Sequence, residues 1–217
     1  FKVGRQIAGE PADDVGGVWQ KCTPDTAAEF SAVAYYFARD LHRETGVPVG
    51  MITAAWGGTP AEAWAAPAVT RDDPDYAPVY AEWEAYRRNY PVIKKRHDEE
   101  MAAYEKALAR PRAPDEKPPA KPLSKPHPDE NPRYPGVLFN GMVNPLAGLP
   151  LKGIVWYQGE SNKDRWAQYE KLLTSLITDW RKRWGQADLP FLIVQIANFK
   201  TRASEPSDSG RARVREA

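Results

Sequence analysis

Apolar residues occur along this chain in two patterns, and the first of them predicts β-strands. Short continuous apolar runs bounded by turn residues are typical of strands buried on both faces of a parallel sheet. Such runs occupy residues 47–56 and 153–157, residues 189–199 are a further clear strand candidate, and residues 1–6 have a weaker strand pattern. The sequence therefore predicts four strands, with an irregular loop after the first of them up to residue 20.

The second pattern, apolar residues at three- and four-residue steps, predicts helices. One amphipathic helix is expected over residues 23–46, facing the core, and a second over residues 166–184. Gly46 ends the first helix and Gly185 follows the second, and glycine commonly terminates helices. A short helix is expected after the turn at residues 57–60, and a short apolar helix or loop over residues 137–146.

Strands and helices alternate along the chain, which is the order of parallel βαβ units with right-handed crossovers. We therefore expect an α/β fold, a three-layer α/β/α sandwich around a parallel sheet. A chain of 217 residues that is 42% hydrophobic can bury one sizeable core. A single domain over residues 1–217 is the prediction.

Residues 70–133 depart from this alternation and are interpreted as an insertion into that domain. Their first part is a charged helical stretch with aromatic residues at helical spacing, either two helices or one kinked near Pro91. After Arg110 the sequence is rich in proline and lysine, which predicts an extended and mobile segment. The aromatic stripe is either the face that docks the insertion or a platform for carbohydrate.

Charge and composition exclude several classes of partner. The formal net charge is +1, so no overall field attracts nucleic acid or anionic lipid. No apolar run reaches the roughly 20 residues of a membrane span. The single Cys22 has no partner for an internal disulfide and is expected to pack inside, while no cysteine or histidine spacing indicates a metal. No cofactor is predicted, and neither the compartment nor the oligomeric state can be read directly.

Two polar loops that follow predicted strands are the candidate site, because ligands of open α/β sheets bind at the carboxyl ends of strands. The glycine pair Gly57 and Gly58 would expose backbone N–H groups at a helix start, a plausible anion cradle. The loop at residues 158–162 offers the side chains of Gln158, Glu160 and Asn162. In an alternative interpretation, Asn162 or Ser161 only caps the following helix.

One further polar residue is a second-rank candidate. Asn140 is uncharged and stands inside the apolar run at residues 137–146. A buried amide needs hydrogen-bond partners, and a ligand is one possible partner. Asn140 is therefore included as a substrate-binding candidate.

Several strings, in order along the chain, resemble the sialate O-acetylesterase family of the SGNH hydrolases. They are FSAVAY at residues 30–35, WGGTPAEAW at 56–64, FNGM at 139–142, WYQGESN at 156–162 and DWR at 179–181. The resemblance spans nearly the whole chain except residues 70–133. It implies a flavodoxin-like α/β/α fold, an acetylated carbohydrate as substrate, and ester hydrolysis by a Ser nucleophile and a His base. It also makes a secreted or periplasmic location possible.

The resemblance further implies roles for residues of the two loops. Gly57 is the expected backbone donor of an oxyanion hole, and Gln158 the favoured side-chain donor with Asn162 second. Gly58, Glu160 and Asn140 are expected to contact substrate, although Glu160 is better explained as a structural carboxylate, with orientation of the base as a further alternative.

The family's Gly-Gln-Ser-Asn and Asp-x-x-His motifs do not occur in these residues, and His42, His97 and His127 stand outside any such motif. We therefore expect a fragment without the nucleophile and base of the enzyme. The competing hypothesis is a catalytically inactive carbohydrate-binding or scaffold protein on the same fold. A phosphate-binding enzyme is less favoured, because the glycine loop lacks P-loop spacing and a basic residue.

Overall fold

The computed structural model describes residues 1–111, 116–199, 205 and 208–217. It divides the chain into two compact units, one formed by Phe1–Asp75 with Pro132–Ala217 and the other by Tyr76–Asn131. The smaller unit lies within the range expected for the insertion. Each unit is described separately.

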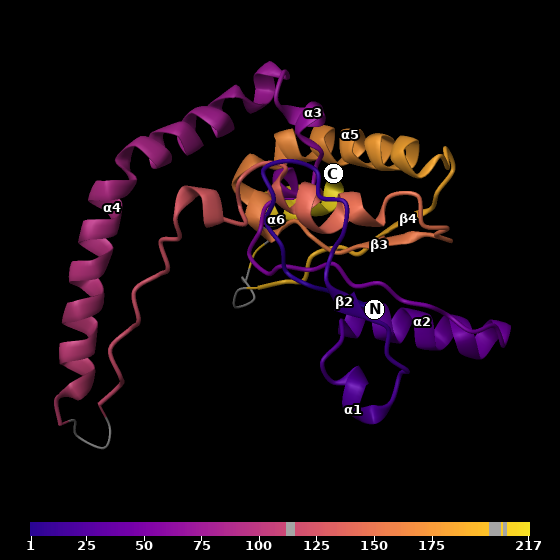
Figure 1. Cartoon of the computed structure of the whole chain (residues 1–217), viewed down its shortest axis with the longest axis horizontal. Coiled ribbons are helices and arrows are strands. Elements are labelled where there is room, and N and C mark those ends of the chain that lie inside the picture. The colour runs from indigo at the N-terminus through magenta and orange to yellow at the C-terminus, as the bar shows by residue number, and fades with distance from the viewer. Residues whose placement is uncertain (112–115, 200–204, 206–207) are drawn as a thin grey trace. The chain divides into compact units, whose positions relative to one another are not determined.

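The larger unit contains a βαβ crossover. Strand β3 (Ile154–Trp156), helix α5 (Trp166–Trp184) and strand β4 (Phe191–Ile193) follow one another, and β3 pairs with β4 in parallel (Figure 1). The predicted strands at 153–157 and 189–199 and the helix at 166–184 are confirmed, with shorter strands than expected. The expectation that residues 153–157 form a strand buried on both faces is wrong, because Ile154 and Val155 are only half-buried.

The amino-terminal part carries a second, smaller pair of strands. Strand β1 (Lys2–Val3) pairs antiparallel with β2 (Gly17–Val18), a strand that the sequence pattern had left in a loop. The predicted strand at residues 47–56 is wrong. It contributes one parallel bridge between Thr53 and Lys2, with the backbone N–H of Thr53 donating to Phe1 at 2.9 Å. An apolar run becomes a strand only where a neighbouring backbone supplies a ladder, and here only one residue has such a neighbour.

The chain is therefore an α/β protein whose described residues form two separate two-stranded sheets. The parallel β3–β4 pair agrees with the expected direction of the strands. The complete three-layer sandwich stays a prediction.

The helix expected over residues 23–46 is two helices. A capping box between Thr23 and Thr26 starts the short α1 (Pro24–Ala27). The Ser31 hydroxyl accepts from Ala34 N at the start of α2 (Ala32–Thr45). Gly46 ends α2 in the left-handed conformation (φ 69°), as expected. The expectation that this helix faces the core is wrong, because Ala38 is its only buried residue.

An aromatic cluster around Trp180 of α5 lies in the core of the larger unit. Trp180 lies edge-on to Trp156 with ring centroids 5.9 Å apart, stacks on Trp184 at 5.8 Å and contacts Phe139 at 6.4 Å. Phe139 belongs to a buried π-helical turn, η4 (Phe139–Val143), followed by the 3₁₀ turn η5 (Asn144–Leu146). This confirms the predicted short apolar helix.

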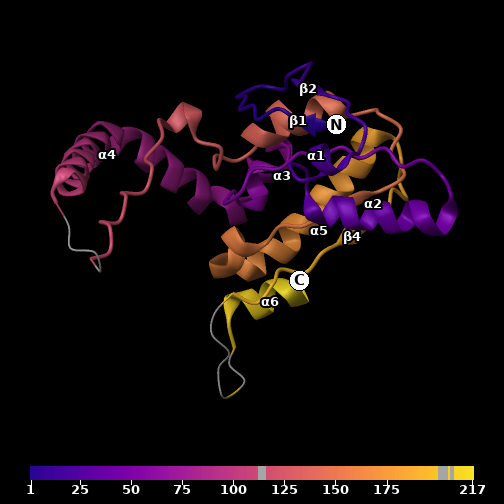
Figure 2. The ribbon, with the colours of Figure 1, turned by 90° about the horizontal axis from the view of Figure 1, so that it is seen from below.

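Shorter elements surround this core. They include the 3₁₀ turn η1 (Ala61–Ala63), helix α3 (Pro67–Thr70) and the 3₁₀ turn η6 (Glu160–Arg165). Helix α6 (Gly210–Glu216) packs against α5 and η6 (Figure 2). The packing of α3 and α5 and of η1 and α5 brings the segments after residue 57 to the crossover helix.

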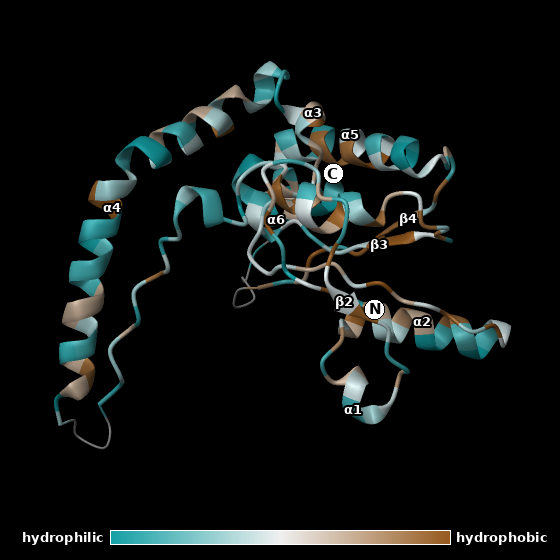
Figure 3. Cartoon of the chain, in the orientation of Figure 1, coloured by the Kyte–Doolittle hydropathy of each residue, from teal (hydrophilic) through white to brown (hydrophobic). Residues whose placement is uncertain are grey.

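The smaller unit is dominated by one helix, α4 (Ala77–Ala109), which contains Pro91 and follows the 3₁₀ turn η2 (Pro74–Tyr76). Most of α4 is hydrophilic (Figure 3). Its tyrosines contact the returning segment: Tyr86 donates to Pro126 O at 2.8 Å, and the Tyr90 ring lies 5.0 Å from His127, next to the 3₁₀ turn η3 (Pro128–Glu130). Part of the aromatic stripe thus packs within the unit itself. Of the helices in the described residues, none has the length and apolar character needed to cross a membrane.

Candidate active site

The two polar loops singled out in the sequence meet in the larger unit. Gln158, just after β3, donates from Nε2 to the Thr59 carbonyl at 3.3 Å and to Asn162 Oδ1 at 2.8 Å. Asn162 Oδ1 also accepts from the backbone N–H of Ala61 at 2.9 Å. Three hydrogen bonds therefore join or organise segments that lie about a hundred residues apart in the sequence.

The second loop owes its shape to Gly159 and Tyr169. Gly159 has φ 152°, and a Cβ atom there would lie 2.7 Å from Val214 Cγ1 and 3.0 Å from Ile196 Cγ2. The Tyr169 hydroxyl on α5 donates to Gln158 O at 3.0 Å and accepts from Trp156 Nε1 at 3.2 Å. Burial raises the pKa of Tyr169 above its ordinary value. These contacts hold the backbone on both sides of the Gln158 side chain.

The glycine loop is held from inside by Thr59. Its hydroxyl donates to Trp56 O at 2.7 Å and accepts from Trp64 Nε1 at 2.9 Å, and Arg133 donates to the Gly58 carbonyl. Gly58 is left-handed (φ 78°). Gly57 is exposed, and within the described part of the chain its N–H has no hydrogen-bond acceptor. A rigid loop thus presents an available backbone donor.

A buried carboxylate that sequence reasoning missed lies beneath the loops. Glu62 is 1% exposed, forms an ion pair with Arg165 and accepts from Asn162 Nδ2 at 2.8 Å. A buried charge needs such partners. The available signal was a single acidic residue inside the apolar string at residues 61–66, a position at which a charge is otherwise costly.

The structure places the other predicted residues as follows. Asn162 is 1% exposed and accepts from the first residue of η1, whereas neither η6 nor α5 has a side-chain cap, so the helix-cap interpretation of Asn162 or Ser161 is wrong. Gln158 is half-buried, and its Oε1 atom is buried without a partner among the described residues. Glu160 is exposed at the start of η6.

Asn140 lies elsewhere in the same unit. Its Nδ2 donates to the carbonyls of Ala8 at 3.3 Å and Gly9 at 2.9 Å, and its backbone carbonyl accepts from Ala12 N at 3.0 Å. The residue is 1% exposed. Its bonds go to the amino-terminal loop, not to the two polar loops.

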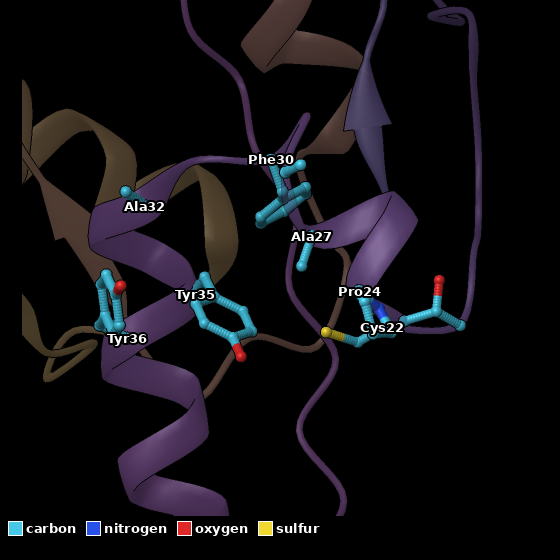
Figure 4. Close-up of a pocket in the computed structure, with 9 residues that line it drawn as sticks. Cys22, Pro24, Ala27, Phe30, Ala32, Tyr35 and Tyr36 are labelled. Carbon is cyan, nitrogen blue, oxygen red and sulfur yellow. The ribbon is translucent and has the colours of Figure 1, made fainter.

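An open pocket of about 550 Å³ lies apart from these residues, beside α1 and α2 (Figure 4). Phe30, Tyr35 and Tyr36 line it together with Cys22, which is exposed. The expectation that Cys22 packs inside is wrong, since the helices around it leave their apolar side chains accessible. Within the described residues, no group of three or more His, Cys, Asp or Glu side chains is placed to hold a metal ion.

Comparison with known proteins finds similar sequences and a similar fold. Residues 135–215 match the sequence model of a family described as carbohydrate esterase, sialic acid-specific acetylesterase. A solved structure of a carbohydrate acetylesterase from Xanthomonas citri is similar over the whole chain, with a TM-score of 0.67 and 29% identity, and the chain covers 38% of it. The chain is thus an α/β protein that is similar in sequence and fold to carbohydrate esterases.

Curated relatives specify the class further. The sialate O-acetylesterase of Mus musculus is 29% identical over 99% of this chain, and that of Homo sapiens 29% identical over 91%. These similarities support a relationship of the chain to the sialate O-acetylesterase family. It spans 39% of the mouse protein and 32% of the human protein.

Proposed function

We propose that the protein containing this chain hydrolyses O-acetyl esters of carbohydrates, sialic acid being one candidate substrate. The family and the names of its relatives support the reaction class. The observation that carries the proposal is the N–H of Gly57, which has no acceptor among the described residues and lies in a loop to which the Gln158 amide is hydrogen-bonded. Preorganised donors of this kind stabilise the negative oxygen that develops during ester hydrolysis.

In this proposal Gly57 N–H and Gln158 Nε2–H form the oxyanion hole. One N–H of Gln158 is used in the 2.8 Å bond to Asn162. The other points to the glycine loop in a long 3.3 Å bond to Thr59 O. It can exchange this weak bond for a charge-assisted one to the tetrahedral oxygen. Asn162 is the less favoured donor, because it is buried and bonded to three neighbours.

The rest of the mechanism is proposed from the family resemblance. A serine attacks the acetyl carbonyl, a histidine takes the serine proton and later protonates the leaving sugar hydroxyl, and an aspartate orients the histidine. These residues are proposed to lie in the part of the protein that the chain does not span. The exposed Gly58 and Glu160 are proposed to contact the sugar, on a three-layer sandwich interrupted by the insertion at 70–133.

The test is hydrolysis of a small chromogenic acetyl ester by the protein, with two substitutions at one position. Gly57→Pro removes the N–H, whereas Gly57→Ala keeps it and meets no atom within 4 Å. We expect the proline variant to lose far more turnover than the alanine variant at equal folding. Equal losses would remove Gly57 N–H from the mechanism. Binding of acetylated sugar without any turnover by the wild-type protein would support the inactive carbohydrate-binding alternative.

A further inference from the structure

We propose that Glu62 is a positioning residue, which acts through Asn162 to set the direction in which the Gln158 amide points. The proposal deepens the proposed function, on which its consequence for turnover rests. Its basis is a series of hydrogen bonds in which groups of fixed polarity, the Glu62 carboxylate and the Ala61 N–H, determine how the two amides are oriented. The series runs from Arg165 through Glu62 and Asn162 to Gln158.

Glu62 can only accept hydrogen bonds, and this fixes the direction of the bonds that follow. A carboxylate has no hydrogen to donate, and Glu62 is ion-paired with Arg165 through Oε1 while Oε2 lies 2.8 Å from Asn162 Nδ2. Glu62 is 1% exposed, so water does not compete for these contacts. Asn162 must therefore turn its NH₂ group, and not its oxygen, toward Glu62.

A second, independent contact demands the same orientation of Asn162. Its Oδ1 lies 2.9 Å from the backbone N–H of Ala61, a group that can only donate. If the amide were reversed, its NH₂ would face that N–H and its oxygen would face the carboxylate. Each of these contacts is repulsive, and inside a protein such mismatches are expensive. Asn162 Oδ1 is thus held where it meets Gln158.

The polarity of Asn162 in turn decides that of Gln158. Gln158 Nε2 lies between two acceptors, Asn162 Oδ1 at 2.8 Å and Thr59 O at 3.3 Å. With the amide reversed, Gln158 Oε1 would face two oxygens. The side of Gln158 that meets the glycine loop is therefore a donor, as an oxyanion hole needs. Glu62 does not reach the loop's exposed face, so its effect is indirect.

Two complementary substitutions distinguish an effect of Glu62 on hydrogen-bond direction from an effect of its negative charge alone. In Glu62→Gln, the new amide can accept from Arg165 only by turning its NH₂ toward the NH₂ of Asn162. Asn162→Asp places two carboxylates in contact. In the double variant, the introduced glutamine accepts from Arg165 and donates to the introduced aspartate, which still accepts from Ala61 N and Gln158 Nε2. Only the bond between residues 62 and 162 reverses its direction, and every donor still meets an acceptor.

The experiment measures kcat and KM for an acetyl ester in the wild-type protein, the two single variants and the double variant. Each single variant is expected to lower kcat about 100-fold, the lower end of the loss for one oxyanion donor, with little change in KM. The double variant is expected to recover most of this loss. No recovery in a folded double variant would overturn the proposal, because a role of Glu62 as the charge partner of Arg165 predicts no rescue.

A readout independent of activity follows the Gln158 side-chain NH₂ by ¹⁵N NMR, with Gln158→Ala to assign the resonance. Slow hydrogen exchange of this group is expected in the wild-type protein and the double variant, and fast exchange in either single variant that folds. If hydrogen exchange of the Gln158 NH₂ stayed slow in a folded single variant, the proposed role of Glu62 would be overturned. If the wild-type protein hydrolyses no ester but the variants show the expected exchange rates, the proposed function is wrong while the positioning role of Glu62 is supported.

Discussion

Two buried asparagines of the larger unit, Asn162 and Asn140, differ in what they hold together. Both are 1% exposed, and both were site candidates on the sequence alone. Asn162 connects the two polar loops and the Glu62 carboxylate. Asn140 connects the π-helical turn η4 to the amino-terminal loop at Ala8 and Gly9.

The comparison teaches that burial of an amide identifies a structural demand but not its purpose. Buried polar groups are nearly always hydrogen-bonded, so both asparagines must have partners. At Asn140 the partners are backbone carbonyls, and the neighbouring Gly141 lets that backbone approach, since a Cβ there would lie 2.4 Å from Gln6 O. At Asn162 the partners include two side chains whose polarity it transmits.

The largest expected effect is on the Asn162 side of the comparison. Gln158→Ala removes the side-chain donor and is expected to lower kcat for an acetyl ester about 100- to 1,000-fold. Turnover kinetics at a measured folded fraction check this, with Glu170→Ala on the exposed face of α5 as the control for a substitution nearby. Turnover like that of the control would remove Gln158 from the mechanism.

On the Asn140 side, the expected effect is on stability. Asn140→Ala removes a buried side chain that donates to the carbonyls of Ala8 and Gly9, and is expected to lower the free energy of unfolding by about 1–3 kcal/mol. Asn144→Ala, which removes one bond to Ala12 O at 3.0 Å from a half-buried position, should cost less. Urea denaturation measures both. A loss of kcat/KM beyond the unfolded fraction would instead favour the substrate contact predicted for Asn140.

A smaller effect is expected at Tyr169, which supports the backbone of Gln158. Tyr169→Phe removes the bond to Gln158 O and should lower the free energy of unfolding by about 1 kcal/mol. Because burial raises its pKa, Tyr169 stabilises the fold fully below pH of about 10, its unfolded value, and loses this contribution as pH rises through the folded value. Urea denaturation from pH 8 to 11 should therefore show the wild-type advantage shrinking at the alkaline end. A constant difference would contradict the assignment.

The smallest effect is expected at an exposed cluster that neither asparagine touches. Lys171 on α5 pairs with Asp73 at 2.8 Å and Asp75 at 2.6 Å, and its hydrogen bond holds the pKa of Asp73 below its usual range. The contribution of Asp73 is present above its unfolded pKa and is lost as pH falls through the lower folded value. Lys171→Met should thus flatten the acid limb of a pH–stability curve slightly. A change as large as that of Asn140→Ala would mean that exposed ion pairs matter more here than expected.

Local patterns predicted the parts of the fold whose interactions are local. The helix at 166–184 with Gly185 at its end and the strands on both sides of it follow from periodicity and a glycine stop. The two candidate loops were found because each follows an apolar run. The prediction of a strand at 47–56 was wrong because a strand needs hydrogen bonds to a neighbouring backbone, and no local pattern reveals that neighbour.

By itself, the sequence determined the α/β alternation, the family resemblance and the residue types at the candidate site. Only the tertiary structure decided what each polar group does there: Asn162 accepts from a residue 101 positions away, Glu62 becomes a buried acceptor, and Asn140 holds a loop 131 positions away. The physical reason is that a hydrogen bond has a direction and a partner. An amide can present either its oxygen or its nitrogen, and the surrounding fold chooses which.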